Sequence, residues 1–130
     1  MMISRAIQLV VPLADKPGTL ADLCSVLGSA EVNIIAVFAP EAKGTGMVRV
    51  MVVDLEVARS ALREAKISFS EEEVLDIELD NRPGAFAELA GKLARAKINI
   101  RYAYATTAPF ARARVVMAVP DVTKALAVLK

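Results

Sequence analysis

The chain repeats itself with a period of 66 residues. Asp15–Leu23 returns as Asn81–Leu89, and Val32–Ile34 returns as Ile98–Ile100. Over the full overlap, 17 of 64 positions are identical without any insertion or deletion. A long, fixed period is typical of a duplicated structural module rather than of a short motif. We therefore expect a tandem repeat of one small domain.

The chain length limits how the two copies can be stabilised. We place the first module at residues 1–70 and the second at residues 71–130. Modules of this size are near the lower limit for burying a core alone. Hydrophobic residues make up 55% of the sequence and charged residues 24%, a globular and rather apolar composition. We expect each module to lean on its sister or on a second chain, with a homodimer as the assembly.

Charge and composition exclude several classes of function. A net charge of +1 and an aromatic content of 5% provide neither a basic surface nor stacking rings for a nucleic acid. No apolar run approaches the roughly 20 residues of a transmembrane helix, so we expect no membrane contact. The single cysteine, Cys24, cannot form an intramolecular disulfide, which suits a cytoplasmic location.

Hydrophobic periodicity predicts the same order of elements in both copies. Leu75, Ile77 and Leu79 alternate with acidic residues, as in a half-buried strand. Pro17-Gly18 and Pro83-Gly84 precede helices with apolar residues at i, i+3, i+4 and i+7. The predicted strands are 8–13, 32–38, 47–53 and 67–69, then 74–79, 98–104 and 115–119, with turns at 44–46 and 108–110 and further helices around 58–65 and 125–129. The order βαββαβ favours an α+β fold of two ferredoxin-like modules, each an antiparallel sheet with helices on one face.

The last strand of the second module has no counterpart in the sequence. Nothing follows Lys130 to match Ile67–Phe69, so the second module lacks this strand, borrows one, or belongs to a longer chain. An unpaired edge is a natural docking point. Residues 48–53 are almost continuously apolar, which predicts that both faces of this sheet are covered. We interpret residues 71–73, three glutamates, as a polar link between the modules.

These motifs resemble the ACT domain, the small-molecule-sensing module attached to many enzymes of amino-acid metabolism. The resemblance rests on a strand, Asp/Asn-x-Pro-Gly, an amphipathic helix and Val/Ile-Asn-Ile, repeated over nearly the whole chain. It implies a stand-alone tandem ACT protein that binds an amino acid at the seam between two modules. No cofactor or metal is implied. The histidine of serine-sensing ACT domains is absent, because Leu13 and Leu79 stand there.

The resemblance also implies which residues bind the ligand. The turn before the first helix of one module faces the asparagine that opens the second strand of the other. The matched positions are Asp15, Lys16, Pro17, Gly18 and Asn33 in the first copy, and Asn81, Arg82, Pro83, Gly84 and Asn99 in the second. The second copy matches the family better because it has Asn81 where the first copy has Asp15.

Elementary chemistry supports a ligand at these turns. A helix N-terminus attracts the carboxylate of an amino acid, and a glycine lets the ligand approach the backbone closely. The alternative is structural: the Pro-Gly pairs can simply start helices, and Asn33 and Asn99 can be turn residues. Tyr102 and Tyr104 suggest packing, while Arg101, Arg112 and Arg114 are either solvated or a basic patch.

Three classes of function remain. The leading interpretation is a non-catalytic amino-acid sensor whose ligand changes the arrangement of the modules and so regulates a partner enzyme of amino-acid metabolism by allostery. The alternative is a docking or regulatory small subunit without a working ligand site. An enzyme is disfavoured because the chain has no histidine and no repeated nucleophile beside a base, so we expect no catalytic residues.

Overall fold

The computed structural model describes residues 1–109 and 111–130, so the turn predicted at 108–110 lies partly outside the described residues. The elements follow one another as β1 Met2–Ala14, α1 Thr19–Ser29, β2 Ile34–Phe38, β3 Thr45–Val52, α2 Leu55–Glu64, β4 Ser70–Leu79, α3 Ala85–Arg95, β5 Tyr102–Thr106, β6 Ala113–Ala118 and α4 Val122–Leu129. This order confirms the predicted α+β fold of two ferredoxin-like modules.

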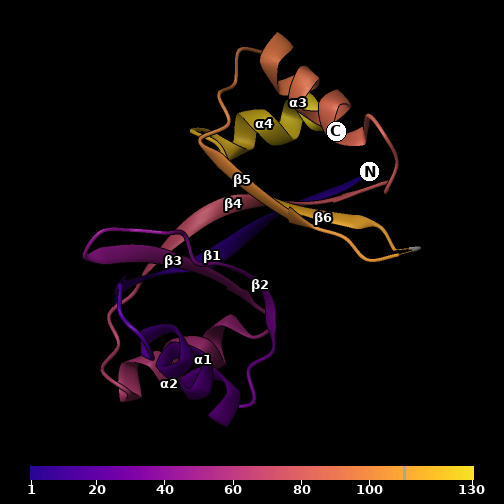
Figure 1. The fold of residues 1–130 in the computed structure, drawn as a ribbon. Helices are drawn as coiled ribbons and strands as arrows, with labels where there is room; N and C mark the ends of the chain where they lie inside the picture. Colours follow the sequence, from indigo (N-terminus) through magenta and orange to yellow (C-terminus); the bar gives the residue numbers. More distant parts are fainter. Residues whose placement is uncertain (110) are drawn as a thin grey trace. The chain divides into compact units, whose positions relative to one another are not determined.

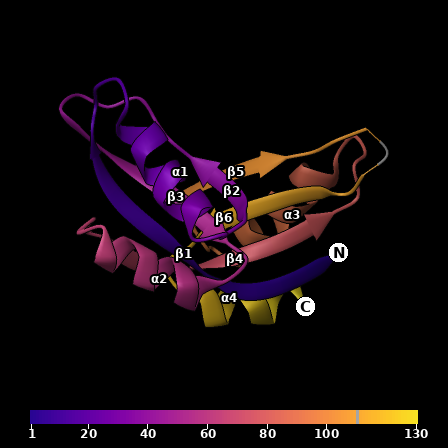
Figure 2. The ribbon, with the colours of Figure 1, turned by 90° about the horizontal axis from the view of Figure 1, so that it is seen from below.

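The chain forms two compact units, and the division between them runs through β1 and β4. The first module comprises Ile7–Glu72, and the second comprises Met1–Ala6 with Glu73–Lys130. The strand order is β2-β3-β1-β4 in the first module and β1-β4-β6-β5 in the second. Within each module two helices lie on one face of the sheet, α1 with α2 and α3 with α4 (Figures 1 and 2). Within the described residues, no helix is long and apolar enough to span a membrane.

The start of the chain occupies the fourth-strand position of the second module. Met2–Ala6 belongs to that module and lies next to β4, just as the first residues of β4 lie next to β1 in the first module. Ile3 packs against the core of the second module, whereas Phe69, which is 66 residues later, packs against the core of the first. The second module thus takes its last strand from residues that the sequence had assigned to the first.

The position predicted for the fourth strand of the first module was wrong by a few residues. Residues 67–69 are not in a strand, and β4 begins at Ser70. The three glutamates at 71–73 are therefore part of a strand, and their interpretation as a polar link was also wrong. Glu71 pairs with Arg59 of α2 at 2.6 Å, and Glu73 pairs with Arg5 of β1 at 2.5 Å. Arg5 also donates to Thr123 of α4 at 3.0 Å, so each fourth strand is tied to the second helix of its own module.

The register of the strands shows that the repeat contains a one-residue insertion. Leu9 lies opposite Val50 in the first module, but the corresponding Leu75 lies opposite Met117, a step of 67 residues along β3 and β6. The earlier match of Val50 with Val116 was wrong, because a shift of one residue turns a strand side chain to the opposite face. At the step of 67, core residues match core residues: Val48, Val50 and Val52 match Val115, Met117 and Val119. Because β2 and β5 keep the step of 66, the extra residue lies in the hairpin between β5 and β6.

Both faces of each sheet are closed, as the apolar strands predicted. The face toward the helices carries the two main cores. Residues on the opposite face are buried as well: Gln8, Val10 and Met51 in the first module, and Val74, Val116 and Ala118 in the second. Burying this second face explains why β3 and β6 are almost continuously apolar.

The shared fourth strands lead to a matched pair of predictions. Ile3→Ala should loosen the second module and Phe69→Ala the first, each by about 1–3 kcal/mol because both side chains are partly buried apolar groups. Native-state amide exchange locates the effect, with β6 amides reporting on the second module and β3 amides on the first. Faster exchange in β3 for Ile3→Ala would contradict this assignment.

Candidate functional site

The predicted turns before α1 and α3 have the same backbone geometry. Gly18 and Gly84 are the N-cap residues of these helices, with φ angles of 96° and 86° in the left-handed region that favours glycine. Neither turn supplies a side-chain cap to the helix. By contrast, the second helix of each module is capped by an aspartate: Asp54 accepts from the N–H of Val57, and Asp121 from that of Lys124. Only the first helix of each module therefore begins without a capping side chain.

The two asparagines are positioned by the ends of the same helices. Beyond α1 and α3, Glu31 and Lys97 adopt positive φ, and the N–H groups of Val32 and Ile98 bond back to the carbonyls of Leu27 and Leu93 at 2.9 Å. This helix-ending motif buries the apolar residue and leaves the next side chain outside. Asn33 and Asn99 are accordingly exposed.

Within one module, the turn and the asparagine lie at opposite ends of a helix. Both α1 and α3 are 11 residues long, which corresponds to about 16 Å at 1.5 Å per residue. Gly84 stands before α3, and Asn99 follows its end. A single module therefore does not bring the two predicted groups of site residues together.

In the first module, backbone and hydroxyl contacts hold the turn. The Asp15 N–H donates to the carbonyl of Gly44 at 2.6 Å, and the Thr19 hydroxyl donates to the carbonyl of Ala14 at 2.8 Å. The side chains of Asp15, Lys16 and Pro17 are exposed. These side chains are thus available to a ligand without any change in the fold.

In the second module, charged side chains cross the turn. Arg82 donates to both carboxylate oxygens of Glu88, at 3.2 and 2.9 Å, and its Nε lies 3.7 Å from Asp80. Asp80 also pairs with Arg112 at 3.2 Å, while Arg112 lies 3.7 Å from Glu78. Hydrogen bonding from Arg82 lowers the pKa of Glu88, and the same bond raises the pKa of Arg82. Both groups are therefore charged at neutral pH.

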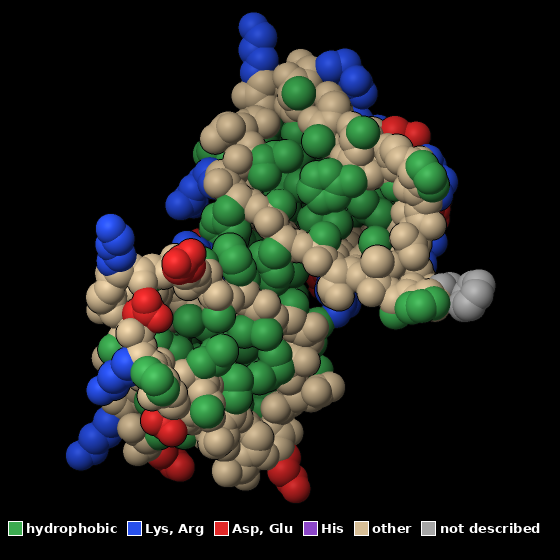
Figure 3. Space-filling view, in the orientation of Figure 1, with side chains coloured by type: hydrophobic (Ala, Val, Ile, Leu, Met, Phe, Trp, Pro, Cys, Tyr) green, Lys and Arg blue, Asp and Glu red, His purple; other side chains and the backbone are tan. Residues whose placement is uncertain are grey.

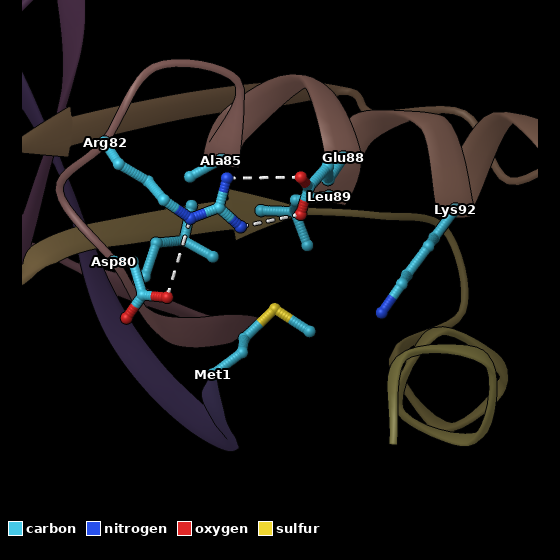
Figure 4. A pocket seen from close by; sticks show the side chains of 8 residues that line it. Met1, Asp80, Arg82, Ala85, Glu88, Leu89 and Lys92 are labelled. Carbon is cyan, nitrogen blue, oxygen red and sulfur yellow. Dashed lines mark hydrogen bonds and ion pairs between the residues drawn. The ribbon is translucent and has the colours of Figure 1, made fainter.

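A small hollow lies beside this network. It has a volume of about 80 Å³, and it is lined by Met1, Leu79, Asp80, Arg82, Ala85, Glu88, Leu89 and Lys92. Figure 4 shows the guanidinium of Arg82 between Asp80 and Glu88. Pockets that enclose a small molecule have about 300–1,000 Å³, so this hollow can hold only part of a ligand.

The sequence analysis missed the charged partners of Arg82. Glu88 was placed on a solvent-facing helix position, and Asp80 was not considered. A signal was present in the repeat, since Pro12, Ala14 and Val26 of the first copy are replaced by Glu78, Asp80 and Lys92 in the second.

The option of a basic patch at 101, 112 and 114 was wrong for two of its three residues. Arg112 pairs with carboxylates, as described above, and Arg114 lies 3.2 Å from Asp76. These arginines belong to a mixed-charge face of β4 and β6, whose opposite charges offset one another.

The family of the chain follows from its sequence profile. The profile of the ACT domain pair matches residues 3–124. The chain belongs to this family. No curated protein matches it.

Solved structures share the fold of this ACT domain pair. Protein BT0572 of Bacteroides thetaiotaomicron is 29% identical, with a TM-score of 0.91 over 98% of this chain and 88% of that one. The regulatory subunit of aspartate kinase from Thermus thermophilus, in its ligand-free form, is 16% identical, with a TM-score of 0.65 over 99% and 95%. E. coli aspartokinase III in complex with lysine and aspartate is 15% identical, with a TM-score of 0.54 over 97% of this chain and 30% of that one.

Other residues of the ACT pair do not form a reactive site. No group of three or more acidic, histidine or cysteine side chains in the described chain is placed to hold a metal ion. Cys24 is a free thiol on α1 and is partly buried. Its position corresponds to Ala90 on α3, which indicates a packing role.

The Arg82–Glu88 pair predicts a specific acid titration. Because the folded state lowers the pKa of Glu88, the contribution of the pair to stability is present at neutral pH and is lost as the pH falls through that pKa. Arg82→Gln should raise the pKa of Glu88 toward that of an ordinary glutamate, as measured by carboxyl ¹³C NMR. Glu71 is the control, because its pKa is lowered by Arg59 instead and should not change. An unaltered Glu88 in the variant would show that Arg82 is not its partner in solution.

Proposed function

We propose that this ACT domain pair is a non-catalytic regulatory protein that binds an amino acid at the starts of α1 and α3. The observation that carries the proposal is the contrast in capping. Asp54 and Asp121 cap the second helix of each module, whereas the first helix of each begins at a glycine without a side-chain cap. A ligand carboxylate can take the position that a capping side chain takes elsewhere.

The two turns offer different environments to an amino acid. Gly18 and Gly84 leave the backbone accessible, because a Cβ built at either position would meet no atom within 4 Å. Asp15 favours an ammonium group and disfavours a nearby carboxylate, whereas Asn81 can donate and accept. We therefore propose unequal sites, with the turn at Asn81-Arg82-Pro83-Gly84 binding more tightly.

We propose that each complete site lies at a seam and combines the turn of one module with the asparagine of another. The support is the separation of about 16 Å between the two ends of α1 or α3, together with the small hollow beside Arg82, about 80 Å³ in volume. Asn33 and Asn99 are exposed and can complete such a site. Their amide groups can bind both the ammonium and the carboxylate of a ligand.

We propose a homodimer as the assembly that carries regulation. The end strands of the two modules, β2 and β5, contain no charged residue and no proline, and such edges favour pairing with another chain. Apolar side chains also gather on the visible surface of each module (Figure 3). A ligand that binds two modules at once favours one arrangement over another, which is how it can change the behaviour of a partner enzyme.

A partner enzyme of amino-acid metabolism is proposed from the neighbours with this fold. Two of them are a regulatory subunit of aspartate kinase and an aspartokinase solved with lysine and aspartate. The alternative is a docking subunit without a working ligand site. The apolar end strands are compatible with both, so only a binding measurement separates them.

The first experiment is a thermal-shift screen of the wild-type chain against the twenty amino acids at millimolar concentration. A ligand at 100 times its dissociation constant adds about 2.7 kcal/mol of stability, which raises Tm by several degrees in a small domain. We expect a selective rise for one amino acid or a few related ones. If no amino acid raises Tm, the amino-acid sensor is rejected in favour of the docking subunit.

A variant pair locates the binding. Asn99→Ala should weaken binding of the amino acid found in the screen, by about 1–2 kcal/mol for the loss of a hydrogen-bonding side chain. Ser25→Ala, on an exposed position of α1, is the matched surface control and should bind normally. Normal binding by Asn99→Ala would remove this asparagine from the site.

A further inference from the structure

We propose that Glu88 is an internal stand-in for the ligand carboxylate, holding Arg82 in the empty second-module site and releasing it when a ligand binds. This inference rests on the proposed function, and it adds a self-competing contact to one of the two sites. Glu88 therefore sets the affinity of that site.

The first argument is the position of the Glu88 carboxylate. Glu88 lies in the first turn of α3, and its N–H donates to the carbonyl of the N-cap residue Gly84 at 2.9 Å. Its side chain meets Arg82 from the turn just before the helix (Figure 4). The anion thus stands at the end of the helix where a ligand carboxylate is proposed to bind.

The second argument is the geometry of the pair. Two parallel N–H···O bonds of 3.2 and 2.9 Å join the guanidinium to the carboxylate. A free amino acid presents the same planar carboxylate, so it can form the same fork with Arg82. One guanidinium edge cannot hold both carboxylates in this way, and binding requires an exchange.

The third argument is the weak hold that Glu88 has on Arg82. The two side chains are 47% and 63% exposed, so water screens their attraction. Asp80 also contacts the guanidinium, and it keeps Arg82 near the turn when Glu88 leaves. The contact is therefore weak enough for a ligand to displace and strong enough to lower the apparent affinity.

The first module provides an internal comparison. Lys16 and Asp22 occupy the positions of Arg82 and Glu88, and no ion pair joins them in the part of the chain that the structure describes. Ala14 stands in place of Asp80. A lysine cannot form the two-bond fork. The stand-in is thus a property of the second module alone, which makes Asp22 a matched control position.

Calorimetric titration of Glu88→Gln, Asp22→Asn and wild type tests the proposal, using the amino acid that raises the wild-type Tm most. We expect Glu88→Gln to bind about three- to fivefold more tightly, the range for losing an exposed competing pair. Asp22→Asn should bind like wild type. The double variant Arg82→Gln/Glu88→Gln should lose the gain, because the gain depends on the freed guanidinium.

Each outcome bears on a different claim. Unchanged or weaker binding by Glu88→Gln, with a wild type that binds, overturns the stand-in and leaves the sensor function intact. A gain that survives in the double variant also overturns it, because Arg82 is then not the group released. If Glu88→Gln responds to an amino acid in the thermal screen and wild type does not, the stand-in is supported in its strongest form. If no variant and no wild type binds any of the twenty, the proposed function fails and the stand-in fails with it.

Discussion

The fold depends on two long strands that each serve both modules. The first residues of β1 complete the second module and its later residues belong to the first, while β4 is divided in the opposite sense. Neither module is therefore a continuous stretch of chain with its own four strands. This sharing explains why Ile3 and Phe69 pack in different cores, and why Arg5 and Glu71 reach the second helices. A 130-residue chain in this way builds two small cores with every fourth strand in place.

The same architecture separates the two halves of the proposed site. The turn at Gly84 and the side chain of Asn99 are held at opposite ends of α3, and the first module repeats this arrangement. A ligand that needs both must engage two modules, and such a ligand can report on how they are arranged. The apolar second face and the uncharged end strands provide surfaces along which modules can meet. In this account regulation follows from the division of the site, since no single module completes it.

The sequence predicted the fold well because its strongest signals are local and occur twice. Alternation in Leu75–Leu79 and the helical spacing of Leu89 and Leu93 are visible without a structure. The fourth strands were misplaced because residues 2–6 continue directly into the next strand, and only the fold shows which core receives Ile3. The ungapped repeat misled at Val50 because valine and methionine occur on both faces of β3 and β6. The partners of Arg82 could not be predicted, since the fold brings Asp80, Glu88 and Arg112 together from different elements.

The central claim is that an amino acid binds at the uncapped starts of α1 and α3. The most direct test is amide chemical-shift mapping of the wild-type chain during titration with the amino acid that stabilises it most. The account predicts that the largest changes fall in residues 81–88, with a second set in residues 15–22 and changes at Asn33 and Asn99 at the far ends of the helices. Changes confined to the outer groove between α1 and α2, lined by Ser25, Ala61 and their neighbours, would contradict it.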